Sequence, residues 1–201
     1  MGSSARRQRF AGAARQRQRA GFTMVELITV IVLIGILGAI GAARFFDNSI
    51  YEGRAYSDQV KALIRHAQKL AISQNRPVFV RADLGGFAVC FDATCTSAAN
   101  LADAPSGANS GNSRTQAYCL LGGAYISRWL CEARPLNVAL TGNGLSTPQV
   151  NSFYFDAMGR PYNIGNAAGA SNFATMTLTF TSGAIQNRVA IVQETGYVYA
   201  P

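Results

Sequence analysis

The chain has 201 residues, of which 49% are hydrophobic, and this is enough for one domain with a proper core. Its formal net charge is +8, but six of its eighteen Lys and Arg residues lie before residue 20, where no acid occurs. From Phe22 onward twelve basic side chains face ten acidic ones, which argues against a broad nucleic-acid-binding face. The basic residues of the tail are Arg6, Arg7, Arg9, Arg15, Arg17 and Arg19.

An apolar run follows this basic tail. Residues 22–43 carry one charge, that of Glu26, and as a helix they would reach roughly 30 Å, enough to cross a bilayer core. Positive residues that flank an apolar helix stay in the cytoplasm, so we expect the chain after Ala43 to be exported. A carboxylate in such a helix costs about 2.5–3.5 kcal/mol at its centre, so Glu26 needs a partner.

Three interpretations of the run compete. It could be a secretory signal that is cleaved at the small residues 41–43, or a plain uncleaved anchor. Neither explains the acid five residues after Gly21. In the third, the tail is removed after Gly21, and the new amine of Phe22 in one chain pairs with Glu26 of its neighbour.

The segment Gly21-Phe22-Thr23-Met24-Val25-Glu26-Leu27, between a basic leader and an aliphatic helix, resembles the N-terminal motif of type IV pilins and pseudopilins. The resemblance implies that a prepilin peptidase cuts after Gly21 and methylates Phe22, and that Glu26 recruits the subunit into a filament. Many members have a proline near the end of the apolar run, where this chain has Ala43.

Beyond the run, apolar residues from Val60 to Ala71 keep three-and-four spacing, which predicts that one helix continues from Phe22 to about Asn75, before Pro77. Alternating segments then predict a hairpin at 78–91 and strands near 152–155, 175–180, 188–192 and 197–199. The fold class is therefore α+β, a long N-terminal helix packed on an antiparallel sheet. The expected parts are a leader at 1–21, a membrane or filament-core helix at 22–43, its amphipathic continuation at 44–76, and a β-rich head at 77–201 with a flexible surface loop near 96–116.

Four cysteines fit an exported head. Their even number favours disulfides, and we favour the pairs Cys90–Cys95 and Cys119–Cys131 because each closes a short loop. Three pairings are possible in principle. A zinc site is disfavoured, since neither pair has the two-residue spacing of zinc ribbons.

Nothing in the sequence indicates an enzyme, a cofactor or a metal. His66 is the single histidine, Gly122-Gly123 lacks the lysine of a phosphate loop, and Glu132 and Asp156 read as surface and turn residues. The stripe Lys61, Arg65 and Lys69 is typical of a solvated helix face; the alternative is a DNA-binding surface, although no aromatic side chains are interleaved with it.

Segments of the head are similar to minor subunits of the same superfamily. These segments are 67–71, 155–161 and 189–196. The similar subunits are the H-type pseudopilin of type II secretion, the fimbrial T minor pilins and the C-type minor pilin of MSHA pili. Residues 43–47 favour the MSHA-type minor pilin. The resemblance implies a single-pass bacterial inner-membrane protein with a periplasmic head. Its implied partners are prepilin peptidase, other pilin or pseudopilin subunits, the inner-membrane assembly platform and, before assembly, the lipid bilayer.

Overall fold

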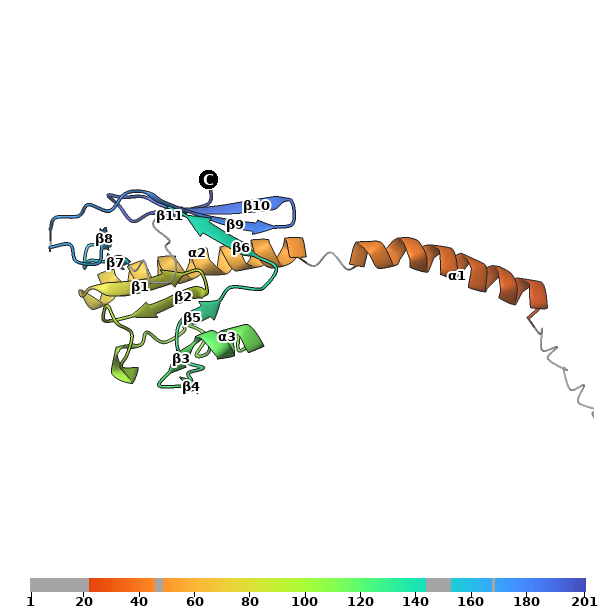
Figure 1. Ribbon diagram of the computed structural model, residues 1–201, viewed down its shortest axis with the longest axis horizontal. Helices are drawn as coiled ribbons and strands as arrows, with labels where there is room; N and C mark the ends of the chain where they lie inside the picture. Colours follow the sequence, from red (N-terminus) through yellow and green to blue (C-terminus); the bar gives the residue numbers. More distant parts are fainter. Residues whose placement is uncertain (1–21, 46–48, 144–152, 168) are drawn as a thin grey trace, which may run out of the picture. The chain divides into compact units, whose positions relative to one another are not determined.

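The computed structural model describes residues 22–45, 49–143, 153–167 and 169–201. The chain divides into two compact units, residues 1–46 and 47–201. The first holds helix α1, Met24–Phe45, and the second, called the head below, holds helix α2, Ser49–Gln74, and the strands (Figure 1). The sequence predicted one helix to Asn75; the structure describes two, and residues 46–48 between them lie outside the described residues.

Helix α1 is apolar on every side. Its described side chains, up to Gly38, are all exposed, and its large apolar residues range from 41% exposed at Val30 to 81% at Met24. Each Å² of apolar surface that is covered contributes roughly 25 cal/mol, so this helix gains stability from whatever covers it. Among the residues that the structure describes, no helix is both long enough and apolar enough to cross a membrane.

Helix α2 is amphipathic and buries one face. The predicted apolar seam is confirmed: its members Val60, Leu63, Ile64, Ala67 and Ala71 are buried, and Leu70 is partly buried against the core. The helix ends as Pro77 requires: Asn75 takes a left-handed conformation with φ of 50°, and the Arg76 N–H reaches back to the Ala71 carbonyl at 3.2 Å.

Two antiparallel sheets pack against α2 (Figure 1). The five-stranded sheet has the order β5-β2-β1-β7-β8, and its strands are β1 Val78–Asp83, β2 Gly86–Cys90, β5 Cys131–Ala133, β7 Phe153–Phe155 and β8 Pro161–Asn163. The four-stranded sheet has the order β11-β10-β9-β6, and its strands are β6 Ala139–Gly142, β9 Met176–Ser182, β10 Ile185–Ile191 and β11 Val198–Tyr199. A ribbon of β3, Leu120–Leu121, and β4, Ala124–Tyr125, follows the short helix α3, Ser113–Tyr118.

The core lies between α2 and the inner faces of both sheets. Ile64, Phe87, Phe155 and Phe180 are all fully buried, and Tyr56 packs edge-on against Phe180 with ring centroids 5.6 Å apart. The predicted α+β class is confirmed. The head, however, has two sheets and a two-stranded ribbon where one antiparallel sheet was expected.

The segment 96–116 differs from the surface loop that its composition predicted. Leu101 and Ala102 are buried, and the backbone of Ala102 bonds to Val89 on one side and Leu130 on the other. Small side chains allow this close approach of backbones, and the bonds satisfy the buried peptide groups.

Candidate assembly site at the start of helix α1

The first turn of α1 is fixed by Thr23. Helix α1 begins at Met24, so Thr23 occupies the N-cap position, and its Oγ1 accepts a hydrogen bond from the Glu26 N–H at 3.3 Å. The Thr29 hydroxyl donates to the Glu26 carbonyl at 2.9 Å. The backbone of Glu26 is thus held on both sides by threonine side chains.

The carboxylate of Glu26, in contrast, is free. Glu26 is exposed, and its side chain makes no hydrogen bond or ion pair with any residue that the structure describes. It lies in the first turn of an apolar helix, where the positive end of the helix dipole favours an anion. A cation from outside the helix is the partner that this geometry accepts.

The expected processing position adjoins this turn. Phe22 is 76% exposed, while Gly21 and the rest of the leader lie outside the described residues. Cleavage after Gly21 and methylation of Phe22 therefore stay predictions.

Sequence reasoning overlooked the cap at Thr23. The signal was present, because Thr23-Met24-Val25-Glu26 has the spacing of a capping box. Only one of the two capping-box bonds is formed, the one from the Glu26 N–H. The Glu26 side chain is therefore not used to cap its own helix.

The three residues of the basic stripe on α2 differ in the contacts that they make. Lys61 pairs with Asp58 at 2.5 Å, and the Arg65 guanidinium donates two hydrogen bonds to the Val198 carbonyl, at 2.9 and 2.5 Å. Lys69 alone of the three is exposed without such a contact. The expected solvated face is wrong for Arg65, which ties the last strand to the helix, and the DNA-binding alternative gains no support here.

His66 lies beside this stripe on α2, is half-buried, and lines a small cavity together with residues of the segment 104–109. Burial lowers the pKa of His66, and the positive charge of Lys69 lowers it further. Within the described ranges no three His, Cys, Asp or Glu side chains are grouped so that they could hold a metal ion.

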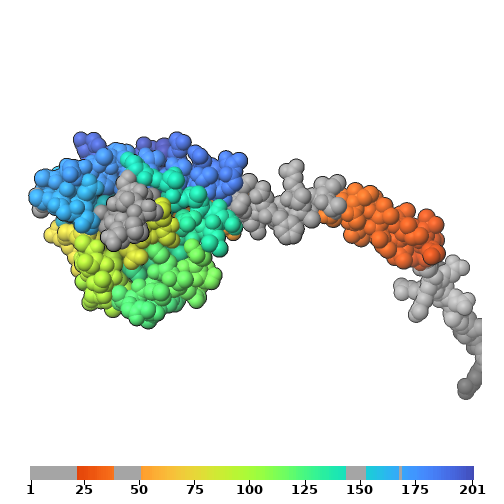
Figure 2. All heavy atoms as spheres, in the orientation of Figure 1, coloured from red at the N-terminus to blue at the C-terminus, as the bar shows by residue number. Residues whose placement is uncertain are grey.

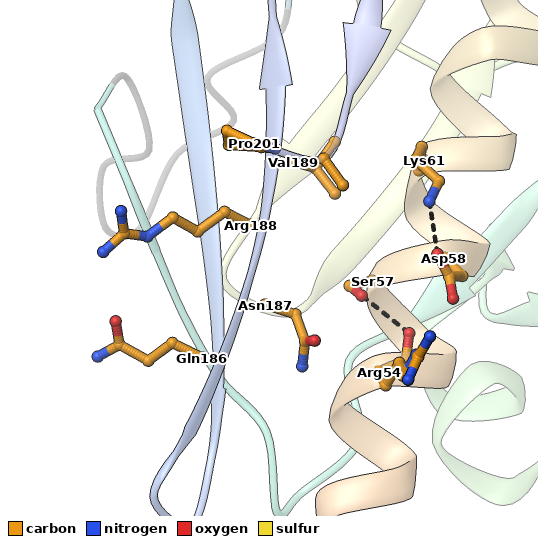
Figure 3. A pocket seen from close by; sticks show the side chains of 10 residues that line it. Arg54, Ser57, Asp58, Lys61, Gln186, Asn187, Arg188, Val189 and Pro201 are labelled. Carbon is orange, nitrogen blue, oxygen red and sulfur yellow. Dashed lines mark hydrogen bonds and ion pairs between the residues drawn. The ribbon is translucent and has the colours of Figure 1, made fainter.

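A cleft of about 480 Å³ opens between α2 and β10 (Figure 3). Asn187 and Val189 point from β10 toward the helix, whereas Arg188 points away from it (Figure 3). The helix side of the cleft carries Arg54 and the ion pair of Asp58 with Lys61. Asp58 is the one acidic side chain among the described residues that line the cleft, and it is paired with Lys61.

The four cysteines form two disulfides, Cys90–Cys95 and Cys119–Cys131, which are the pairs favoured from the spacing. They enclose Trp129, which is fully buried and donates its indole N–H to the Val89 carbonyl at 2.9 Å. This second core is separate from the one under α2.

Glu132 is buried, which corrects its expected place on the surface. It is only 6% exposed and accepts hydrogen bonds from the Ser110 N–H at 2.7 Å, the Ser110 hydroxyl at 2.6 Å and the Thr115 hydroxyl at 3.0 Å. The carboxylate thus orders the segment 110–115 against β5. Asp156 is a turn residue as predicted, and it accepts from the N–H groups of Met158 and Arg160.

Comparison with known proteins finds a match in the N-terminal segment. Residues 16–42 match the prokaryotic N-terminal methylation motif. The matched segment contains residues 21–27, on which the resemblance to type IV pilins and pseudopilins rests.

Among individual relatives, the chain is similar to the type IV narrow pilus major component PilA5 of Thermus thermophilus, with 41% identity over 58 residues. The match covers 29% of this chain, and the chain spans about half the length of that relative (50%). Two solved structures align at 12% identity. One is the type IV minor pilin FimU of Pseudomonas aeruginosa; the alignment covers 77% of this chain and 91% of FimU, with a TM-score of 0.43. The other is the minor pseudopilin EpsH of Vibrio cholerae; the alignment covers 75% of this chain and 96% of EpsH, with a TM-score of 0.46. At such TM-scores the likeness carries no argument about the head.

Proposed function

We propose that this chain is a subunit of a type IV pilus or type II secretion pseudopilus that enters a helical filament through α1. The observation that carries the proposal is the exposure of every described side chain of α1, together with a Glu26 carboxylate that has no partner among the described residues. Other copies of such a helix supply both the apolar contacts and the cation. The role within the filament is that of a minor subunit that primes, caps or decorates it, a role supported by the resemblance of the head segments to minor subunits.

The proposed life history has two stages. The precursor is held in the bacterial inner membrane by the apolar run, with its basic leader in the cytoplasm and its head in the periplasm. Two disulfides in the head suit that oxidising compartment. Prepilin peptidase then cuts after Gly21 and methylates Phe22, and the assembly platform moves the subunit into the filament.

Glu26 is the recognition group in this scheme. Its carboxylate pairs with the terminal amine of a neighbouring Phe22, which removes the cost of burying either charge and fixes the axial register of the two helices.

The test is Glu26→Ala in the native host. We expect normal cleavage, so that the mature chain begins at Phe22 by N-terminal sequencing, but at least a tenfold loss of the chain from sheared filaments. The matched control is Glu52→Ala, which removes the same side chain from the first turn of α2. Normal incorporation of the Glu26→Ala chain contradicts the pairing, and a mature chain that begins at Arg44 favours the ordinary signal peptide instead.

A further inference from the structure

The end of the head at which α2 begins, called the base below, exposes large apolar side chains from three elements. Tyr51 on α2 is 76% exposed, Leu136 between β5 and β6 is 72% exposed, and Ile185 at the start of β10 is 43% exposed. Isolated apolar residues on a surface are ordinary, but three from separate segments at one end form a patch.

Hydrogen bonds hold these three segments together. Asn137, next to Leu136, donates through its side chain to Glu52 at 3.4 Å and accepts from the Ser182 hydroxyl at 3.3 Å. Ser182 in turn pairs with Ile185 across the β9–β10 turn. In Figure 2 the β9–β10 turn (blue) and the residues before β6 (teal) lie at the same end of the head.

The base also gathers the unpaired arginines of the head. Six of the nine described arginines in the head have a partner for the guanidinium group, and these are Arg65, Arg76, Arg81, Arg128, Arg134 and Arg160. The three without a partner among the described residues are Arg54, Arg114 and Arg188. Arg54 and Arg188 line the cleft beside the base, and Arg114 lines a groove with Glu52 and Leu136.

We propose that the base docks on the headgroup region of an anionic lipid bilayer. Exposed apolar side chains that enter the interface, together with arginines that meet anionic headgroups, are the two components of peripheral membrane binding. A second head is the weaker partner. Glu194 is the one acidic side chain in the described part of the head without a hydrogen bond or ion pair, so the side chains of another copy offer little charge to match three arginines.

The inference rests on the proposed membrane stage. Helix α1 ends at Phe45 and α2 begins at Ser49, so the connection spans at most about 14 Å even when fully extended. If α1 is held in a bilayer, this short connection keeps the base close to the bilayer surface.

The test uses the full chain in vesicles that contain brominated lipids, which quench tryptophan by contact. Leu136→Trp places a probe at the base, and Met158→Trp places one at a similarly exposed site, 74% exposed, in the turn between β7 and β8. The native Trp129 is fully buried and gives the same background in both. We expect at least twofold stronger quenching at position 136 than at 158 in anionic vesicles, and a smaller difference in zwitterionic ones.

The contribution of charge is tested by the double variant Arg54→Gln with Arg188→Gln. We expect it to abolish most of the difference in quenching between positions 136 and 158. The matched control, Arg128→Gln with Arg160→Gln, removes the same charge from paired arginines and should preserve it. Flotation of the vesicles reports the anchor separately. A chain that does not float overturns the membrane stage and the docking together. A chain that floats with equal quenching at both sites overturns the docking alone. Acrylamide, a water-soluble quencher, gives the last outcome: if the tryptophan at position 136 is shielded from acrylamide but not quenched by the brominated lipids, the base has a protein partner instead.

Discussion

Helices α1 and α2 are neighbours along the chain and treat apolar surface in opposite ways. Helix α2 buries six apolar residues against two sheets, whereas every described side chain of α1 is exposed. Composition explains the difference, since α2 has a polar face and α1 has none. The partners of α2 are therefore within the head, and we expect those of α1 to come from other molecules. Substitutions in the two helices should accordingly change different measurements.

The largest effect is expected for Ile64→Ala in α2. Ile64 is fully buried, so the truncation should lower the free energy of unfolding of the head by about 2–5 kcal/mol, measured by denaturant titration of Trp129 fluorescence. The same substitution at Ile34, which is 63% exposed on α1, should change it by less than about 0.5 kcal/mol. Equal losses at the two positions would mean that α1 is part of the core of the head.

The Cys119–Cys131 disulfide gives the next largest effect. Replacing both cysteines by serine opens a crosslink between residues 12 apart and should destabilise the head by about 2–4 kcal/mol. The corresponding change at Cys90 and Cys95, only 5 apart, should cost less because the closed loop is shorter. Neither pair should alter flotation with vesicles, which depends on α1. A loss of flotation that accompanies a folded head would contradict this division.

Glu132→Gln tests the buried carboxylate of the head against the free one of α1. It weakens three charge-assisted hydrogen bonds and should lower the free energy of unfolding by about 1.5–3 kcal/mol, with faster proteolysis of the segment 110–115. The control Glu26→Gln removes a carboxylate that has no partner in the described residues, so head stability should not change. If both variants unfold at the same denaturant concentration as the native chain, the Glu132 contacts contribute little.

Periodicity predicted the helix face and most strands of the head. The seam from Val60 to Ala71 and the hairpin of β1 with β2 were readable because helix and strand periods survive in a single sequence. The strands β5 and β6 were not predicted: they are three and four residues long, and no run of aromatic or β-branched residues marks them, whereas such runs mark the equally short β7 and β11.

Side-chain roles that depend on distant partners could not be read in this way. Arg65 binds the Val198 carbonyl across 133 positions of sequence, and Glu132 finds its donors in a segment whose composition resembles a loop. The motif around Glu26, by contrast, is local, so the sequence revealed both its acid and its apolar setting.

The smallest effect is expected at Asp92, which closes the Cys90–Cys95 loop. Burial opposes ionisation there, but hydrogen bonds from Asn100, Cys95 and Thr94 outweigh it and hold the pKa of Asp92 below its ordinary value. Because the folded pKa is depressed, the stabilisation is present above the unfolded pKa near 3.8 and is lost as the pH falls through the folded value. Asp92→Asn should therefore cost about 1 kcal/mol at pH 7 and less below pH ~4, as measured by urea titrations. The control Asp103→Asn, at an exposed ion pair, should cost less than about 1 kcal/mol at pH 7. If the cost of Asp92→Asn stays constant down to pH ~2, the ionised carboxylate is not what stabilises the loop.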